Sequence, residues 1–407
     1  MFLSCLRPKW ASILGALALA FALAVSLSAQ AQTSPSLRSA VEAAWALSPQ
    51  AQALVNRQAE FDARVSAASS LLSGPPSISL SHRTDRPTRN GGLRESEAAL
   101  AFPIWSPGVR SATATSLQAD RQAFDQELVL AKIRLAADVR ELAAQAALAR
   151  NEAQVAQRKQ QEAALLAADV GRRVRVGEVA RLDLLQAQAV RSQAAAAQAQ
   201  AESAAARVNA QWRALTGLND VAELDEAEGG VRESPALLAA DSRLRAAQAK
   251  LALMEIDRRD PMEVGVGVTR ERSAFGAASD TSVRVTLRVP FGTYGRNAPR
   301  LAAARAELDA AQADAMATAR SVKADQESAA SELDAARRAE TLAADRARLS
   351  TEAQTLVGKS YRLGESDLPT RLRADSERFD AELAHARARV DTRRAISKLN
   401  QAFGILP

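Results

Sequence analysis

Cysteine is almost absent from this chain of 407 residues, and histidine is nearly as rare. The only cysteine is Cys5, and the two histidines, His82 and His385, are far apart in the sequence. A catalytic constellation or a metal cage needs several such groups close together. There is also no glycine-rich loop followed by lysine that could bind a nucleotide phosphate. The sequence therefore predicts no enzyme, no catalytic residue, no metal site and no cofactor.

Aromatic side chains make up only 4% of the chain, although 47% of its residues are hydrophobic. Alanine supplies much of that hydrophobic fraction, which favours extended helix packing over a globular core. The net charge is +6, with the charges interspersed and no basic block. Nucleic acid is therefore not an expected partner.

The first 31 residues have the pattern of a secretory signal peptide. Arg7 and Lys9 precede an apolar run, and Ala29-Gln30-Ala31 provides a small-residue cleavage site. A permanent anchor helix is the alternative, but the run is short and no basic residues follow it. We expect residues 1–31 to be removed on export.

The rest of the chain is an internal duplication. The turn sequence Arg175-Val-Gly177-Glu178 reappears as Arg362-Leu-Gly364-Glu365, an offset of 187 positions, and Leu100–Pro103 matches Leu287–Pro290 at the same offset. Repeats at a fixed offset indicate a duplicated structural unit. Each unit reads as a helix, a β-hairpin and a long helical hairpin. The first repeat covers 32–216, with its hairpins at 76–102 and 106–215; a linker covers 217–233; the second repeat covers 234–407, with its hairpins at 262–290 and 297–403.

The predicted strands alternate strictly between two kinds of side chain. Val283, Val285 and Leu287 alternate with Arg284, Thr286 and Arg288. This period of two fits a wall between lipid and an aqueous lumen, with Arg284 and Arg288 facing the lumen. A half-buried soluble sheet is the alternative, although one side here is purely apolar. Four strands cannot close a barrel, and open edges cannot face lipid. A membrane role therefore requires several copies of the chain.

These features together resemble the TolC-type outer-membrane factor family, whose subunits have the same duplicated plan and glycine-centred helix turns. The resemblance implies a mainly α fold with a β-barrel portion, in which three subunits form a twelve-stranded barrel over a periplasmic α-helical tunnel. It also implies a homotrimer in the outer membrane of a Gram-negative bacterium, surrounded by outer-membrane lipid. Such a channel is a passive exit duct, and its partners are a periplasmic adaptor and an inner-membrane transporter of the resistance-nodulation-division type.

Specific residues take roles through this resemblance. The two turns, with Arg175, Gly177, Glu178, Arg362, Gly364 and Glu365, would contact the adaptor. Tyr361 and Asp183 occupy the positions of the family's periplasmic gate. Ser366, Thr370 and Arg373 replace an arginine and two aspartates of the prototype, which argues against an acidic ring at the mouth. The short linker 217–233 resembles the compact branch of the family that is paired with heavy-metal exporters.

Two other classes of protein remain as alternatives. A periplasmic adaptor has one long helical hairpin with lipoyl and β domains, and the duplicated hairpin argues against it. A soluble coiled-coil scaffold would leave the alternating strand Val283–Val289 unexplained.

Overall fold

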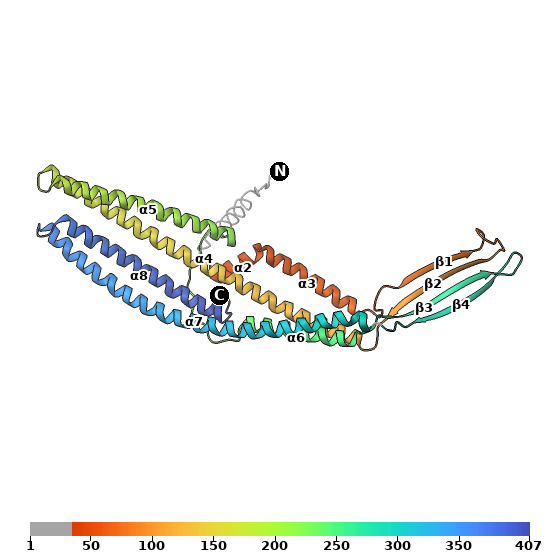
Figure 1. The fold of residues 1–407 in the computed structure, drawn as a ribbon. Helices are drawn as coiled ribbons and strands as arrows, with labels where there is room; N and C mark the ends of the chain where they lie inside the picture. The colour runs from red at the N-terminus through yellow and green to blue at the C-terminus, as the bar shows by residue number, and fades with distance from the viewer. Residues whose placement is uncertain (1–34, 293) are drawn as a thin grey trace, which may run out of the picture.

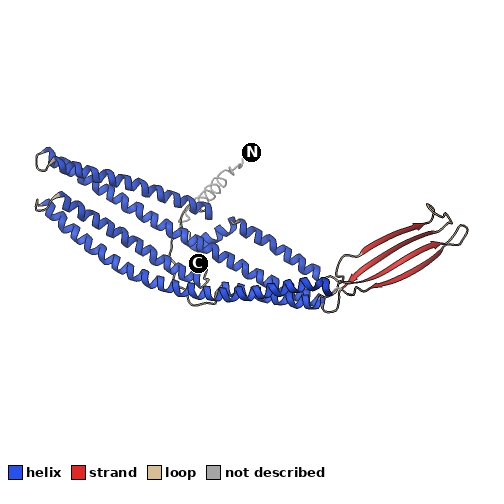
Figure 2. Ribbon diagram, viewed as in Figure 1, coloured by secondary structure: helices blue, strands red, loops and turns tan. Residues whose placement is uncertain are grey.

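The molecule is long and narrow, with a helical body and a four-stranded sheet at one end (Figure 1, Figure 2). This computed structural model describes residues 35–292 and 294–407. The predicted signal peptide, 1–31, lies outside the described residues. The predicted mainly α fold with an antiparallel β portion is confirmed.

Both repeats have the same order of elements. The first contains α2 (Leu37–Leu47), α3 (Pro49–Ala68), β1 (Ser77–Thr84), β2 (Arg94–Ile104), α4 (Val109–Arg175) and α5 (Arg181–Thr216). The second contains α6 (Pro235–Ile256), β3 (Met262–Arg272), β4 (Asp280–Arg288), α7 (Tyr294–Arg362) and α8 (Leu368–Ala402). Residues 217–233 have no regular secondary structure and connect the repeats.

The first helical segment, predicted as one helix, is divided at Ser48. This residue ends α2 and also caps α3, because its hydroxyl accepts a hydrogen bond from the Ala51 amide at 3.4 Å. Pro49 then occupies the first position of α3, where a missing N–H costs nothing. The second repeat has the single helix α6 in the corresponding place.

α4 and α7 run along most of the helical body (Figure 1). They contain 67 and 69 residues, so each is about 100 Å long at 1.5 Å per residue. Each is followed by a shorter antiparallel partner, α5 or α8, and the two turns lie together at the end of the molecule opposite the sheet (Figure 1). None of the helices in the described part of the chain is both long and apolar enough to cross a membrane.

The four strands form one antiparallel sheet in the order β1-β2-β3-β4. Each repeat contributes a hairpin, and pairing of β2 with β3 joins the two repeats, with Leu100 opposite Val266. β1 and β4 are therefore free edges in the single subunit.

The largest core lies midway along the helical body, a region that we call the equator. Trp212 of α5 is fully buried there, and its indole N–H donates to the Asp220 carbonyl at 3.0 Å. Val41 of α2 and Val139 of α4 pack in the same cluster, together with Leu224 of the linker. The linker 217–233 thus fastens onto the helices at the equator.

Candidate functional site

The sheet has one apolar face and one polar face. Cross-strand neighbours share a face, so the register assigns every strand residue. The apolar face contains rows of aliphatic side chains that are largely exposed; Ile78, Leu80, Val283 and Val285 are each 68–75% exposed. An exposed apolar surface of this kind marks a contact with lipid or another protein.

The polar face carries the predicted lumen residues. Arg284 forms an ion pair with Glu97 at 3.2 Å, and Arg288 forms one with Glu263 at 3.5 Å. Small residues fill the middle of this face; a Cβ on Gly267 would lie 2.9 Å from the Ala99 Cβ. Both arginines therefore lie on the face opposite the aliphatic rows.

The two helix turns have closely matching geometry. In the first, the Glu178 amide donates to the Arg173 carbonyl at 2.9 Å and the Gly177 amide to Val174 at 3.1 Å. The second turn has the same pattern: the Glu365 amide donates to the Ser360 carbonyl at 2.9 Å, and the Gly364 amide donates to the Tyr361 carbonyl at 3.2 Å. Both glycines have φ of 78°, a conformation that an L side chain rarely adopts. The six predicted adaptor-contacting residues are all exposed: Arg175, Gly177, Glu178, Arg362, Gly364 and Glu365.

Tyr361 lies inside the tip region, where the two helical hairpins of the subunit meet. Its ring is buried and stands between two guanidinium groups, with Arg173 at 5.3 Å and Arg371 at 5.0 Å from the ring centre. Burial raises the pKa of the tyrosine hydroxyl, and the two arginines oppose that rise. Because Arg173 belongs to α4 and Arg371 to α8, the ring bridges both hairpins.

Asp183, the predicted gate partner, lies in the first turn of α5. After burial, the charges of Asp169 and Asp183 also raise the pKa of Tyr361. In this single subunit, the hydrogen bonds of the described residues do not include one between the Tyr361 hydroxyl and Asp183. The gate bond between these residues stays a prediction.

Of the residues that depart from the family pattern, Thr370 forms a helix-capping contact. Asp367 caps α8 by accepting from the Thr370 amide at 3.0 Å, and its hydrogen bonds with Thr370 lower the pKa of the Asp367 carboxyl. The first turn has Ala180 at the equivalent position, without a side-chain cap. The Ser366 hydroxyl is buried without a hydrogen-bond partner.

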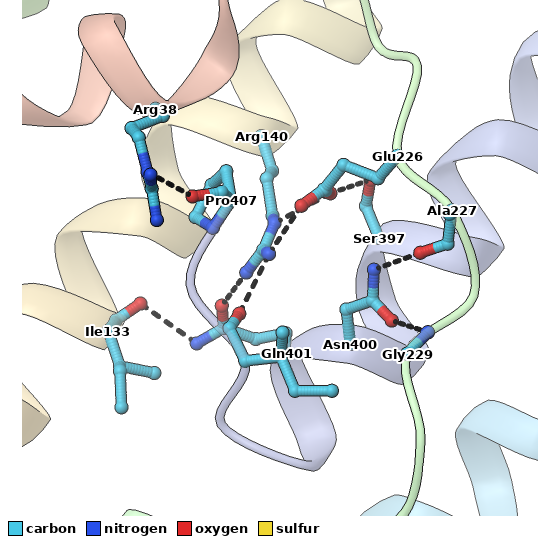
Figure 3. Close-up of polar contacts among 11 residues, drawn as sticks. Arg38, Ile133, Arg140, Glu226, Ala227, Gly229, Ser397, Asn400, Gln401 and Pro407 are labelled. Atoms are coloured by element: carbon cyan, nitrogen blue, oxygen red, sulfur yellow. Dashed lines mark hydrogen bonds and ion pairs between the residues drawn. The ribbon is translucent and has the colours of Figure 1, made fainter.

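A buried ionic network at the equator was not predicted from the sequence (Figure 3). Arg140 of α4 and Glu226 of the linker are 4% and 9% exposed, and they form two hydrogen bonds of 2.9 and 2.6 Å. Arg140 also donates to the Gln401 side chain at 2.6 Å, and the Ser397 hydroxyl donates to Glu226 at 2.6 Å. One guanidinium therefore joins α4, the linker and α8.

Further ion pairs connect α4 to α8 between the equator and the tips. The rungs of this ladder are Glu141–Arg394, Glu152–Arg387, Arg158–Glu382 and Glu162–Arg378. Position numbers rise along α4 as they fall along α8, as expected for antiparallel helices. The ladder and Tyr361 hold the two helical hairpins of one subunit together.

Among residues 35–292 and 294–407, no group of three or more histidine, cysteine, aspartate or glutamate side chains could hold a metal ion. His82 lies on the sheet, where its Nδ1 is 3.0 Å from the Ser96 hydroxyl.

Comparison with known proteins agrees with this architecture. Residues 231–405, nearly the whole second repeat, match the family model described as outer membrane efflux protein. No curated protein matches the chain.

Solved structures match along almost the entire chain. The outer membrane protein VceC from Vibrio cholerae is 16% identical with a TM-score of 0.74, over 90% of this chain and 96% of its own. A membrane protein from Pseudomonas aeruginosa is 20% identical with a TM-score of 0.72, over 91% and 90% of the two chains. The CmeC outer membrane channel from Campylobacter jejuni is 14% identical with a TM-score of 0.73, over 90% and 85%. The resemblance to TolC-type outer-membrane channels is confirmed: the second repeat matches the efflux family model, and the described chain has the fold of these channels.

Proposed function

We propose that this chain is the outer-membrane channel subunit of a tripartite efflux system of a Gram-negative bacterium. Three copies would form a passive exit duct, with the sheet in the outer membrane and the helical body in the periplasm. An inner-membrane transporter of the resistance-nodulation-division type would supply the energy, and a periplasmic adaptor would connect the two.

One observation carries this proposal: a sheet with an exposed aliphatic face stands at the far end of a long helical body. Such a face is unfavourable in water but stable in hydrocarbon. The opposite face, with Arg284 and Arg288, suits an aqueous lumen.

The free strand edges support a trimer. β1 and β4 each present unpaired backbone groups, and these cannot face lipid. Pairing of β1 of one copy with β4 of the next would close the edges, and three copies of four strands give a twelve-stranded barrel. A trimer of this kind also places three copies of both helix tips around one mouth.

The alternative of a periplasmic adaptor is not supported. An adaptor needs one helical hairpin, whereas this chain has two, and its fold matches outer-membrane channels over nine-tenths of its length. The same two-faced sheet argues against a soluble coiled-coil scaffold.

We also propose that the tips form a gate. The Tyr361 ring is held between Arg173 and Arg371, and Asp183 lies in the first turn of α5, next to the other helix turn. A tyrosine hydroxyl that donates to a carboxylate contributes roughly 1.5–3 kcal/mol when shielded from water. Three symmetric copies could hold a mouth closed and still yield to an adaptor that binds the exposed residues around Gly177 and Gly364.

Topology provides the test of the proposed function. The loops 85–93 and 273–279 should be outside the cell, because each joins two strands at the end opposite the helices. Asn90→Cys and Ala277→Cys should react with an impermeant thiol reagent on intact cells. Thr351→Cys, on the helical body, is the matched control and should react only after the outer membrane is permeabilised. Labelling of Thr351→Cys but of neither loop variant on intact cells would contradict the orientation.

A further inference from the structure

Acidic residues are distributed unequally between the two faces of the sheet. Every acidic residue within the four strands lies on the polar face: Glu95, Glu97, Glu263, Glu271 and Asp280. The apolar face contains no acidic residue along β1 to β4. Its charged side chains are all arginine: Arg94, Arg270 and Arg272.

These three arginines cluster at the end of the sheet nearest the two strand-connecting loops. Arg94 lies directly opposite Arg272, and Arg270 lies one row further in, opposite Ser96. Like charges directly opposite each other on neighbouring strands destabilise a sheet. Arg272 donates to the Gly92 carbonyl at 3.4 Å and lies over the Phe275 ring, and neither contact neutralises its charge.

The arginines of the polar face, in contrast, form ion pairs. Arg83 and Arg288 each have a glutamate partner on the neighbouring strand, and Arg284 of β4 reaches across β3 to Glu97 of β2. Within the described ranges, no ion pair involves Arg94, Arg270 or Arg272. The two loops contain a single acidic residue, Asp85, which accepts a hydrogen bond from the Gly91 amide at 2.6 Å and forms no ion pair with these arginines in the described part of the chain.

The basic cluster directly borders the aliphatic rows. Next to the row with Arg270 is the row of Leu80, Ala98, Val268 and Val283, and further aliphatic rows follow toward the helices. The opposite end of this face closes with Ile104 and Met262 and carries no arginine. A lipid contact of this kind would be apolar along most of the sheet and cationic at one end only.

We propose that Arg94, Arg270 and Arg272 bind the phosphates of an outer-leaflet lipid whose headgroup carries more than one phosphate, such as lipid A. Guanidinium groups match phosphate geometry with paired hydrogen bonds. Two arginines facing each other and a third beside them suit a multiply phosphorylated headgroup, while its acyl chains lie on the aliphatic rows. This inference rests on the proposed function, because it needs the apolar face in the outer membrane with the loops outside.

Native mass spectrometry of the purified trimer in mild detergent tests the proposal. Lipid A is titrated onto the wild type and onto the triple variant Arg94→Gln, Arg270→Gln, Arg272→Gln. We expect the triple variant to bind at least about tenfold more weakly, since several charge-assisted hydrogen bonds are lost. The matched control is Arg83→Gln, Arg284→Gln, Arg288→Gln on the polar face, which should bind as the wild type does.

Two further arms identify the ligand. Phosphatidylcholine, which has no net charge, should bind both triple variants and the wild type equally. Millimolar inorganic phosphate should leave most of the bound lipid A in place. Undiminished lipid A binding by the apolar-face variant would overturn the proposal, as would complete displacement by inorganic phosphate, which would indicate a site for free anions. A wild type that forms no trimer would instead count against the proposed function.

Discussion

α4 and α7 descend from one duplicated helix, but their surroundings in the subunit differ. α4 packs against α2, α3, α5, α6 and α8, whereas α7 packs mainly against α6 and α8. α4 consequently buries apolar residues along its length, including Ala136 and Val139, which are fully buried. α7 instead exposes Leu342, Leu349 and Leu356, and Leu363 follows it in the turn; these leucines are 56–74% exposed.

These exposed leucines follow a strict heptad spacing, the repeat that keeps one stripe of a helix against a neighbour. The equivalent positions in the first repeat are Val155, Glu162, Asp169 and Val176, so the stripe is particular to α7. One long helix is therefore enclosed by its own chain, while the other leaves a row of leucines exposed.

The largest expected effect comes from placing charge in that seam. Leu349→Glu combined with Leu356→Glu should prevent trimer formation, because an uncompensated buried charge costs about 3–5 kcal/mol. The helical circular dichroism of the subunit should remain. Mass measurement in mild detergent gives the oligomeric state.

Thr351→Glu combined with Thr355→Glu is the control for this experiment, since it adds the same two charges to another, exposed side of α7. It should leave the trimer intact. A trimer that persists in the double leucine variant would mean that the α7 stripe is not a subunit contact.

The next prediction compares two ion pairs, each formed between a long helix and the linker 217–233. Arg140 of α4 binds Glu226 in a buried site, and Arg337 of α7 binds Glu228 at 2.6 Å with both side chains nearly half exposed. Arg140→Ala should destabilise the subunit by about 3–5 kcal/mol, because it leaves Glu226 buried and unpaired. Arg337→Ala should cost at most about 1 kcal/mol. Urea titrations followed by circular dichroism would measure both.

If the two alanine variants lose equal stability, the equatorial network is no stronger than a surface pair and α4 has no special anchoring. Removing Glu226 as well as Arg140 should recover part of the loss, because the uncompensated charge is then absent.

The smallest effect concerns the ladder between α4 and α8. Arg387 is 52% exposed and pairs with Glu152 at 2.7 Å. Arg387→Gln should reduce stability by about 0.2–1 kcal/mol, and the loss should shrink in 1 M salt as the charges are screened. A loss well above this range that is insensitive to salt would show that the ladder acts through packing and not through charge.

Much of this architecture follows from the sequence alone. The fixed offset between Gly177 and Gly364 located both helix turns, and the alternation around Val285 located the two-faced sheet. Both signals are local and periodic, so each can be read from one segment. The family resemblance placed Tyr361 at the tips, where its burial between two arginines agrees with a structural role.

The equatorial network could not be read in the same way. Arg140, Glu226 and Gln401 come from three separate segments of the chain, and no spacing relates them. An arginine within a helix rich in charged residues reads as solvated, and only the folding of the linker over α4 buries this one. For the same reason, Ala136 and Val139 of α4 are fully buried, because several helices surround α4 at the equator.

Single-channel recording of the purified trimer in planar bilayers tests the central claim that this chain is a gated passive channel. The wild type should show discrete conductance steps without any added nucleotide. Tyr361→Phe and Asp183→Ala should each raise the conductance without changing trimer yield, and the double variant should add little beyond either one, because both remove the same bond. Trimers that show no conductance steps in any of these variants would contradict the channel, and unchanged conductance in both single variants would contradict the gate.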